Sequence, residues 1–225
     1  MARTFAIGDI HGCAVALDTL LEEIQPRPSD TIIGMGDYVD RGPESSRVIE
    51  ILISLVSHCR MVPLIGNHEI MMFKAINDPE KFDFWVQFGG NTTLASYGNS
   101  LRNIPQHHLT FLSHCVRYHE TENHFFVHAN YEADTELDEQ PDELLFWEHI
   151  KEFTPSLHFS GKTAIVGHTP QLDGEVRDLG HVKLIDTHCY GGQWLTALDI
   201  DNDIVIQANN EGHIRTSRLE STESN

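Results

Sequence analysis

The chain has 225 residues and carries 34 aspartates and glutamates against 15 lysines and arginines, a formal net charge of −19. This length suffices for one domain with a full hydrophobic core. A surface with this charge repels nucleic acids and anionic membranes, so we expect the chain to bind neither. Any phosphorylated ligand would need a local positive centre, which two divalent cations could supply.

The cysteines and the first residues bear on the cellular compartment. Four cysteines are scattered through the chain without the spacing of a metal knuckle, namely Cys13, Cys59, Cys115 and Cys189. This pattern favours free thiols in a reducing compartment. The first residues lack the apolar core of a signal peptide, and no apolar run approaches the roughly 20 residues that span a bilayer. We therefore expect a soluble, cytoplasmic protein.

Strands and helices alternate in the first third of the chain. Residues 4–7 predict a short apolar strand, and residues 14–24 predict a helix with apolar side chains at helical spacing. A second strand at 31–35 is followed by a helix over 43–57, and a third strand covers 60–65. Three such alternations in a row predict right-handed crossovers and a largely parallel first sheet.

The middle of the chain changes character at residue 70, and residues 70–114 predict a helical excursion beside the sheet and a candidate wall for a cleft. The second half is richer in strands, which we expect at 116–120, 124–128, 163–166, 182–185, 194–199 and 204–208. Glu122-Asn123 and Asp201-Asn202 mark hairpin turns. The acidic run over 132–143 predicts a solvated loop.

Five polar clusters follow predicted strands, and the ends of such strands converge in α/β proteins. The clusters are Asp9 with His11, Asp37 with Asp40 and Arg41, Asn67 with His68, His128, and His168. Asp9 and His11 lie two residues apart on what we expect to be extended backbone, so both side chains should point the same way. The mixture of carboxylates, an amide and imidazoles suits manganese, iron or zinc. It is large enough for two ions if one carboxylate bridges them.

These clusters form recognisable motifs: GDIHG at 8–12, GDYVDRG at 36–42, GNHE at 66–69, His128, and GHTP at 167–170. Together they resemble the phosphoprotein phosphatases of the calcineurin-like metallophosphoesterase superfamily, and most of all their compact bacterial and phage members of the lambda phosphatase type. The resemblance covers residues 4–208. It implies an α/β fold in which two mixed β-sheets pack as a sandwich flanked by helices, with metals at one rim. We expect a single domain over 1–215 and a flexible tail over 216–225.

The resemblance also implies roles by position. Six side chains would hold two divalent metal ions, Mn²⁺ or else Fe or Zn: Asp9, His11, Asp37, Asn67, His128 and His168. Asp37 would bridge the two ions, and Arg41 and Asn67 would contact the phosphate. His68, oriented by Asp40, would protonate the leaving oxygen while a metal-bound hydroxide attacks phosphorus directly.

Three positions depart from the family pattern, and one of them is Asn130, where relatives usually have glycine two residues after the histidine. Many compact relatives have an arginine shortly after a tryptophan ahead of GHTP, whereas residues 144–149 read LLFWEH. Either His149 replaces this second phosphate clamp or Arg41 acts alone. In the late motif DTHCYGG at 186–192, His188 stands where a small residue is usual, and it either lines the cleft or packs. The aromatic stripe Phe82, Phe84, Trp85 and Phe88 is interpreted as packing rather than as a substrate platform.

The motifs therefore predict a dinuclear-metal-dependent phosphomonoesterase, in the first place a serine/threonine protein phosphatase that also accepts phosphotyrosine and aryl phosphates. The alternative is a hydrolase similar to bis(5'-nucleosyl)-tetraphosphatase, which shares the motif set and would need a nucleoside pocket built from residues 70–114. A binding module without activity is a third reading, which the complete set of motif ligands argues against. A nuclease conflicts with the charge of −19.

Overall fold

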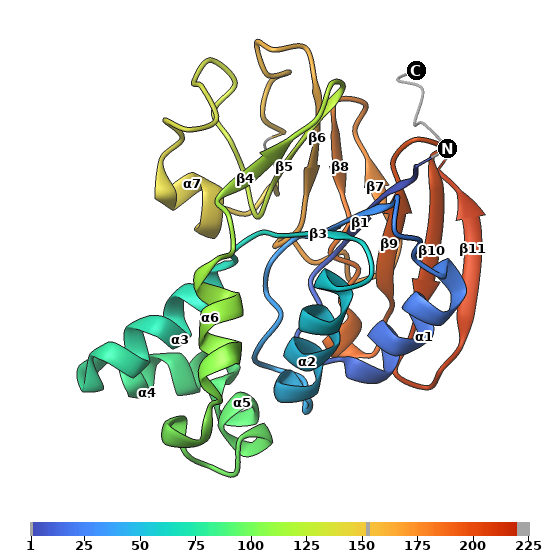
Figure 1. Ribbon diagram of the computed structural model, residues 1–225. Helices are drawn as coiled ribbons and strands as arrows, with labels where there is room; N and C mark the ends of the chain where they lie inside the picture. Colours follow the sequence, from blue (N-terminus) through green and yellow to red (C-terminus); the bar gives the residue numbers. More distant parts are fainter. Residues whose placement is uncertain (1, 152–153, 220–225) are drawn as a thin grey trace.

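The computed structural model describes residues 2–151 and 154–219, and it places them in two mixed β-sheets with helices around them (Figure 1). The first sheet has the order β11-β10-β9-β1-β2-β3. Its strands are β1 (Thr4–Ile7), β2 (Thr31–Gly34), β3 (Arg60–Pro63), β9 (Leu195–Asp199), β10 (Ile204–Ala208) and β11 (Ile214–Arg218). The strands β1, β2 and β3 are parallel and the other pairings are antiparallel.

The second sheet has the order β4-β5-β6-β8-β7. Its strands are β4 (Tyr118–Glu120), β5 (His124–Val127), β6 (Thr163–Val166), β7 (Arg177–Asp178) and β8 (Val182–Leu184). The central strands β5, β6 and β8 are parallel, and the edge strands pair antiparallel to them. Parallel central strands in both sheets bring several strand carboxyl ends to one rim.

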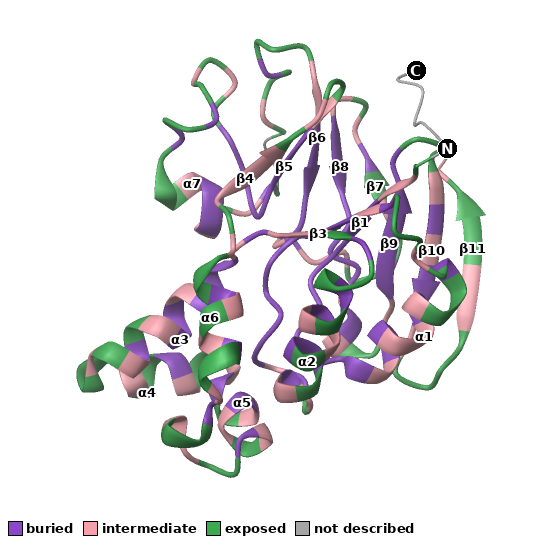
Figure 2. Cartoon of the chain, in the orientation of Figure 1, coloured by how far each residue is buried: buried purple, intermediate pink, exposed green. Residues whose placement is uncertain are grey.

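Alternation along the strands shows how the sheets pack. On β1, Ala6 lies in a core shared with the second sheet, while Phe5 and Ile7 lie in the core under the helices. On β5, Phe126 faces the shared core and Phe125 faces the opposite side. Successive strand residues point to opposite faces, so these apolar runs bury both faces of each sheet. Figure 2 shows the central strands of both sheets as almost wholly buried.

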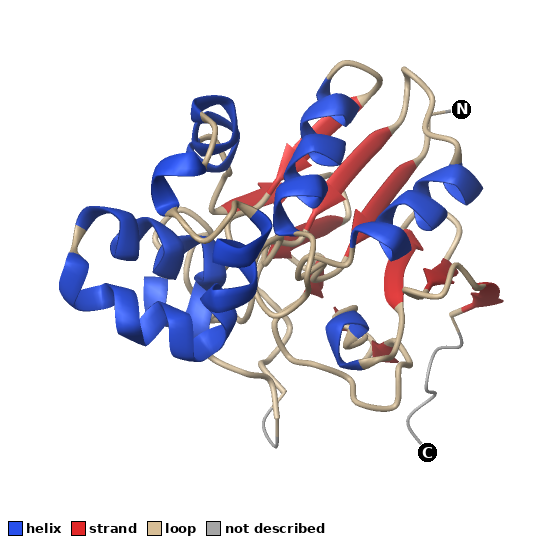
Figure 3. Ribbon diagram, turned by 90° about the horizontal axis from the view of Figure 1, so that it is seen from below, coloured by secondary structure: helices blue, strands red, loops and turns tan. Residues whose placement is uncertain are grey.

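The helices cover the outer faces of this sandwich. They are α1 (Ala14–Ile24), α2 (Ser45–Val56), α3 (Asn67–Asn77), α4 (Phe82–Trp85), α5 (Asn91–Ser96), α6 (Gln106–Ser113) and α7 (Asp142–Trp147). Leucines and isoleucines of α1 and α2 enter the same core as β1. Helices α3 to α6 form a block beside the sheets in Figure 1, and the view from below in Figure 3 shows helices crowded to one side of the strands. We call residues 67–113 the helical block.

The structure confirms the predicted alternation in the first third of the chain, the helix over 14–24, and the hairpins after β4 and after β9. Several boundaries are corrected. Val116 is not in a strand but forms an isolated bridge with Leu64. The predicted acidic loop ends where α7 begins at Asp142. The strand β7 was not predicted, because it has two residues and no apolar alternation.

The end of the chain also differs from expectation. Residues 216–218 belong to strand β11, which pairs with β10 over its whole length, so they are not part of a tail. The remainder of the expected tail, from residue 220, lies outside the described residues. Within the part of the chain that the structure describes, no helix is long and apolar enough to cross a membrane.

Candidate metal centre

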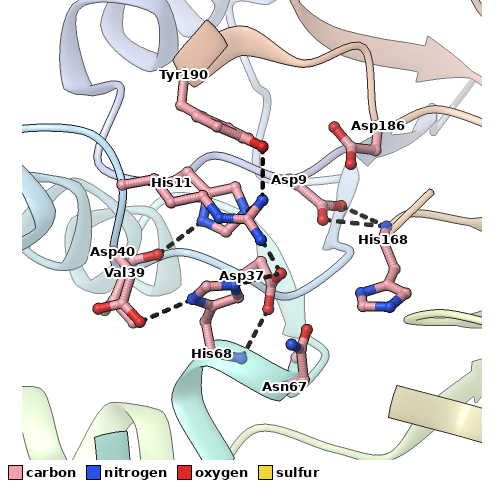
Figure 4. A network of polar contacts seen from close by, with 12 residues as sticks. Asp9, His11, Asp37, Val39, Asp40, Asn67, His68, His168, Asp186 and Tyr190 are labelled. Atoms are coloured by element: carbon pink, nitrogen blue, oxygen red, sulfur yellow. Dashed lines mark hydrogen bonds and ion pairs between the residues drawn. The ribbon is translucent and has the colours of Figure 1, made fainter. Parts of the chain in front are cut away.

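The polar clusters lie in loops that follow parallel strands, and the fold brings these loops together at one rim (Figure 4). The loop after β1 carries Asp9 and His11, and the loop after β2 carries Asp37. Asn67 and His68 open helix α3 just after β3. His128 follows β5 and His168 follows β6. Residues far apart in the sequence are therefore neighbours, as the strand-end argument predicts.

Asp37 lies at the centre of this cluster. One carboxylate oxygen is 3.4 Å from His11 Nε2, and the other is 3.4 Å from His128 Nε2. A terminal atom of the Asn67 amide lies 3.2 Å from Asp37 and 3.2 Å from His168 Nδ1. Burial alone would raise the pKa of Asp37, but the surrounding imidazoles, His128 foremost, hold it far below its usual value. Asp37 thus faces both halves of the site with a charged carboxylate.

Three imidazoles around Asp37 share one arrangement: each donates its outer N–H to a backbone carbonyl. The pairs are His11 with Val39 at 2.9 Å, His128 with Met35 at 2.7 Å, and His168 with Trp147 at 3.0 Å. These bonds fix the tautomers and leave the inner nitrogens as acceptors, which is how metal-ligating histidines are held. Burial lowers the pKa of all three, that of His168 to about 3. Neutral imidazoles are what a metal requires.

The backbone from Asp9 to His11 differs from the extended conformation that we predicted. His11 has a left-handed backbone with φ of 44°, so the two residues are not on extended chain. The backbone N–H of His168 contacts both oxygens of Asp9, at 3.2 and 3.1 Å. Two sets of ligand atoms lie within 4.8 Å of one another, His11-Asp37-His68 and Asp37-His128-His168, and Asp9 belongs to neither set.

A third buried carboxylate, Asp186, faces the same site and was missed as a site residue in the sequence analysis (Figure 4). It lies in the DTHCYGG motif, and its position in that motif was the available signal. Burial raises the pKa of Asp186 to about 7. Burial, together with the charges of Asp186 and Asp37, also raises the pKa of Asp9 well above its usual value. Bound cations would relieve this crowding of carboxylates, so the donor set fits a metal pair.

His68 and Asp40 form a buried pair at the edge of the cluster. His68 Nδ1 donates to Asp40 Oδ2 at 2.8 Å. His68 Nε2 has no hydrogen-bond partner among the described residues and lies 3.9 Å from Asp37 Oδ2. Burial alone would lower the pKa of His68, but Asp37 and Asp40 outweigh it and raise that pKa. The pair therefore places Nε2 of an imidazole with a raised pKa beside Asp37.

Glu69, also without a predicted role, shapes the loop that carries Asp37. Its carboxylate accepts backbone N–H bonds from Asp37, Tyr38 and Val39, and from Gly66 at the start of α3. A Cβ at Gly66 would overlap the Asp37 carboxylate, so only glycine allows this approach. Glu69 thus joins the second and third motifs into one rigid unit.

Arg41 extends over the cluster from the same loop. Its Nη1 donates to the Tyr190 hydroxyl at 2.8 Å and lies 3.3 Å from His11 Nε2. The guanidinium also sits 4.7 Å from the centre of the Tyr190 ring. Tyr190 had no predicted role, because the contact spans 149 residues of sequence.

The two uncertain histidines lie in different places. The ring of His149 is 4.4 Å from that of His168, and His149 lines an adjoining cavity of about 470 Å³ together with Trp147 and Lys151. His188 packs against Tyr190 with ring centres 4.6 Å apart, and the backbone N–H of His188 donates to Asp186 Oδ1. His149 thus lies next to His168, whereas His188 packs against Tyr190, which contacts Arg41.

One further set of potential ligands lies away from the rim. Glu50 on α2 contacts His107 Nε2 at 3.0 Å and His108 Nε2 at 2.7 Å on α6. These bonds fix the helical block against α2.

Comparison with known proteins adds independent information. Residues 2–206 match the model of the family described as calcineurin-like phosphoesterase. Serine/threonine-protein phosphatase 1 of Salmonella typhimurium is 30% identical, over 85% of this chain and 89% of that protein. The asymmetrical bis(5'-nucleosyl)-tetraphosphatase PrpE of Oceanobacillus iheyensis is 27% identical over 85% of this chain and 86% of that protein.

A more local similarity links the chain to symmetrical bis(5'-nucleosyl)-tetraphosphatases. That of Pectobacterium atrosepticum is 44% identical over 68 residues, which is 30% of this chain and only 24% of that protein. The chain thus spans only about a quarter of the length of these symmetrical tetraphosphatases.

Solved structures share the fold. A cold-active protein-tyrosine phosphatase of a psychrophilic Shewanella has a TM-score of 0.71 at 16% identity, covering 95% of this chain and 80% of that one. A serine/threonine phosphatase from Saccharomyces cerevisiae has a TM-score of 0.64 at 16% identity, covering 100% of this chain and 81% of that one. With a family match over most of its length, the chain belongs to the calcineurin-like phosphoesterases, hydrolases that use a dinuclear metal centre.

Proposed function

We propose that the protein is a metal-dependent phosphomonoesterase that removes phosphate from serine and threonine side chains of proteins, in the manner of compact phosphatases of the lambda type. The observation that carries the proposal is the buried His68–Asp40 pair, with His68 Nε2 free of partners among the described residues and beside Asp37. An alkoxide is a poor leaving group and needs a proton as it departs. The similarity to the Salmonella phosphatase over 85% of the chain supports the same class.

In this proposal six side chains hold two divalent cations: Asp9, His11, Asp37, Asn67, His128 and His168. Manganese suits the mixture of oxygen and nitrogen donors, with iron or zinc as the other choices. Cations held there would take up charge from the phosphate oxygens and acidify water, so that a nucleophile exists near neutral pH.

The chain's own residues then divide the remaining work. Arg41 holds the phosphate with its planar fork, and Tyr190 keeps the guanidinium in place. The Asn67 amide contributes a second contact to the phosphate. His68 gives its proton to the leaving oxygen, and Asp40 keeps the imidazole oriented and charged. His149 is placed to act as a further donor, while His188 has a packing role.

A second candidate function is hydrolysis of dinucleoside tetraphosphates. It is favoured by the 27% identity to PrpE over most of both chains. In that reaction the leaving group is a nucleotide phosphate, which departs more easily than an alkoxide and depends less on His68. The nucleoside would require a pocket such as the cavity beside His149.

A direct comparison of substrates tests the proposal. Protein loaded with Mn²⁺ is assayed for phosphate release from phosphoserine and phosphothreonine peptides and for cleavage of diadenosine tetraphosphate. We expect a higher kcat/KM for a phosphopeptide. Turnover of the dinucleotide without turnover of any phosphopeptide would overturn the assignment. The Asp37→Asn variant is the control: unchanged metal content and activity in it would mean that the site is not catalytic.

The wider setting is part of the same proposal. All four cysteines are free, which suits the cytoplasm. The substrate is a phosphorylated protein, and the net charge of −19 argues against nucleic acid or membrane as partners. We treat the chain as one metallophosphoesterase domain, with the helical block as the wall of its cleft.

A further inference from the structure

We propose that Trp85 and Thr93, both on the helical block, are positioning residues for the His68–Asp40 pair and thereby determine how well the protein expels poor leaving groups. The proposal rests on the phosphomonoesterase function above. It also gives a role to the sequence segment FWVQFGGNTT at 84–93, of which only the aromatic residues were interpreted, and those as packing.

The Asp40 carboxylate is wholly buried and is held from three sides. Thr93 Oγ1 donates to Asp40 Oδ1 at 2.7 Å. Trp85 Nε1 lies between the two oxygens, 3.1 Å from Oδ1 and 2.9 Å from Oδ2. His68 Nδ1 donates to Oδ2 at 2.8 Å. Trp85 and Thr93 thus fix the plane of the Asp40 carboxylate, which faces His68.

Thr93 also holds the backbone of Asp40 by a hydrogen bond. Its N–H donates to Thr93 Oγ1 at 2.8 Å, and Ser45 Oγ lies 3.0 Å from the same hydroxyl. Asp40 has a left-handed backbone with φ of 70°, an unfavourable conformation for a residue with a Cβ. Thr93 and Trp85 are themselves fully buried, so these contacts hold without competition from water.

The turn between Trp85 and Thr93 is built for this contact. A Cβ at Gly90 would overlap the Trp85 indole, so glycine leaves room for the ring that reaches Asp40. Gly89 has φ of 109°, and its carbonyl accepts the N–H of Arg41 at 3.2 Å. The chain kinks within Val86–Gly90, because the backbone of Gly89 is not helical. The segment 85–93 therefore contacts both Asp40, which pairs with His68, and Arg41, the proposed phosphate clamp.

The consequence depends on the leaving group. A phenolate with electron-withdrawing groups departs without a proton, whereas phenolate itself and alkoxides gain most from a well-placed donor. A loosened Asp40 would leave His68 misoriented. The loss should therefore be large for poor leaving groups and small for good ones, which a general loss of structure would not produce.

The test uses the full-length protein with Mn²⁺ and a series of aryl phosphates, from p-nitrophenyl phosphate to phenyl phosphate and its electron-rich derivatives, together with a phosphoserine peptide. Thr93→Val removes the hydroxyl at nearly constant shape, Thr93→Ser keeps it, and Trp85→Phe removes the indole N–H. Thr19→Val, in α1, is the matched control, because the Thr19 hydroxyl donates to the Val15 carbonyl within the same helix. Metal content and thermal unfolding are measured for each variant.

We expect Thr93→Val and Trp85→Phe to lower kcat by on the order of 10-fold or more for the poorest leaving groups, because general acid catalysis typically contributes about 10²–10⁴-fold. For p-nitrophenyl phosphate, whose leaving group departs without a proton, we expect a loss of no more than about 3-fold. The plot of log kcat against leaving-group pKa should become steeper. Thr93→Ser should restore the wild-type slope, and Thr19→Val should keep it.

Equal losses across the series in folded, metal-loaded variants would overturn the positioning role, and so would an unchanged slope. If either Thr93→Val or Trp85→Phe fails to fold, the slope of log kcat against leaving-group pKa in the other variant decides whether the positioning role holds. If the wild type hydrolysed aryl phosphates but no phosphopeptide, the proposed protein phosphatase function would fail, while the slopes would still decide the role of Trp85 and Thr93.

Discussion

At the scale of single residues, Arg41 is the proposed phosphate clamp. Its guanidinium contacts Tyr190 through both a hydrogen bond of 2.8 Å and the face of the ring, and its backbone has φ of 68°. The family's second clamping arginine is missing from the segment LLFWEH at 144–149. We therefore expect phosphate binding to depend on Arg41 and on the groups that hold its guanidinium in place.

We predict that Arg41→Ala raises KM for a phosphoester and the inhibition constant of inorganic phosphate by at least about 10-fold, because a hydrogen-bonded charge contact is worth roughly 1.5–3 kcal/mol. The effect should exceed that of one arginine in relatives that have two. Steady-state kinetics with phosphate as inhibitor measure both quantities. If neither constant moved, Arg41 would not be the clamp.

Tyr190→Phe should raise the same inhibition constant by about 5-fold, since it removes one hydrogen bond to Arg41, worth about 1 kcal/mol, and keeps the ring beneath the guanidinium. The matched control is Tyr131→Phe, which loses a hydrogen bond to Ser156 away from the site. Equal effects of the two substitutions on phosphate inhibition would contradict the supporting role of Tyr190.

At the scale of elements, an ion pair between the half-buried Arg3 and the buried Asp30 links the starts of β1 and β2. Arg3 donates to Asp30 Oδ2 through Nη2 at 2.5 Å and through Nε at 3.0 Å. Arg27 and Arg3 add backbone N–H bonds to the same carboxylate. Burial alone would raise the pKa of Asp30, but these bonds outweigh it and lower that pKa to about 2.

This shift predicts how stability depends on pH. Because the pKa of Asp30 is lower in the folded state than its ordinary 3.8, its contribution is complete above pH 3.8 and is lost as the pH falls toward 2. The shift corresponds to about 2 kcal/mol. Asp30→Asn should therefore destabilise the protein by about this amount at pH 7, and the difference in urea midpoints should narrow on acidification to pH 3. A difference that stayed constant with pH would contradict the assignment.

On the scale of the whole molecule, the net charge is −19 and several carboxylates are buried at the rim, among them Asp9, Asp37 and Asp186. We therefore expect the stability of the fold to depend on bound cations. Manganese at 100 times its dissociation constant should stabilise the fold by about 2.7 kcal/mol, and a chelator should remove this gain. Thermal unfolding with and without Mn²⁺ measures the effect. Asp37→Asn should unfold at nearly the same temperature under both conditions, and a full response to Mn²⁺ in that variant would place the ions elsewhere.

The sequence by itself determined the elements that have strong local patterns. Helical spacing of apolar residues predicted α1, and glycine-bounded motifs after apolar strands marked the loops that carry Asp9 and Asp37. Elements without such a pattern, β7 and β11, were not predicted, because their pairing depends on neighbouring strands rather than on their own residues.

Tertiary structure alone decided how the loops are held together. Trp85 and Thr93 reach Asp40 across 45 and 53 residues of sequence, and Tyr190 reaches Arg41 across 149. The position of Trp85 in an apolar stripe predicts that its ring is buried, since burial follows from hydrophobicity. The contact between the Trp85 N–H and the Asp40 carboxylate depends on the packing of the helical block against the motif loops. The periodicity of the sequence does not predict that contact. The motif 36–42 was therefore visible from its residues, whereas the groups that orient Asp40 and Arg41 within it became visible only in the folded chain.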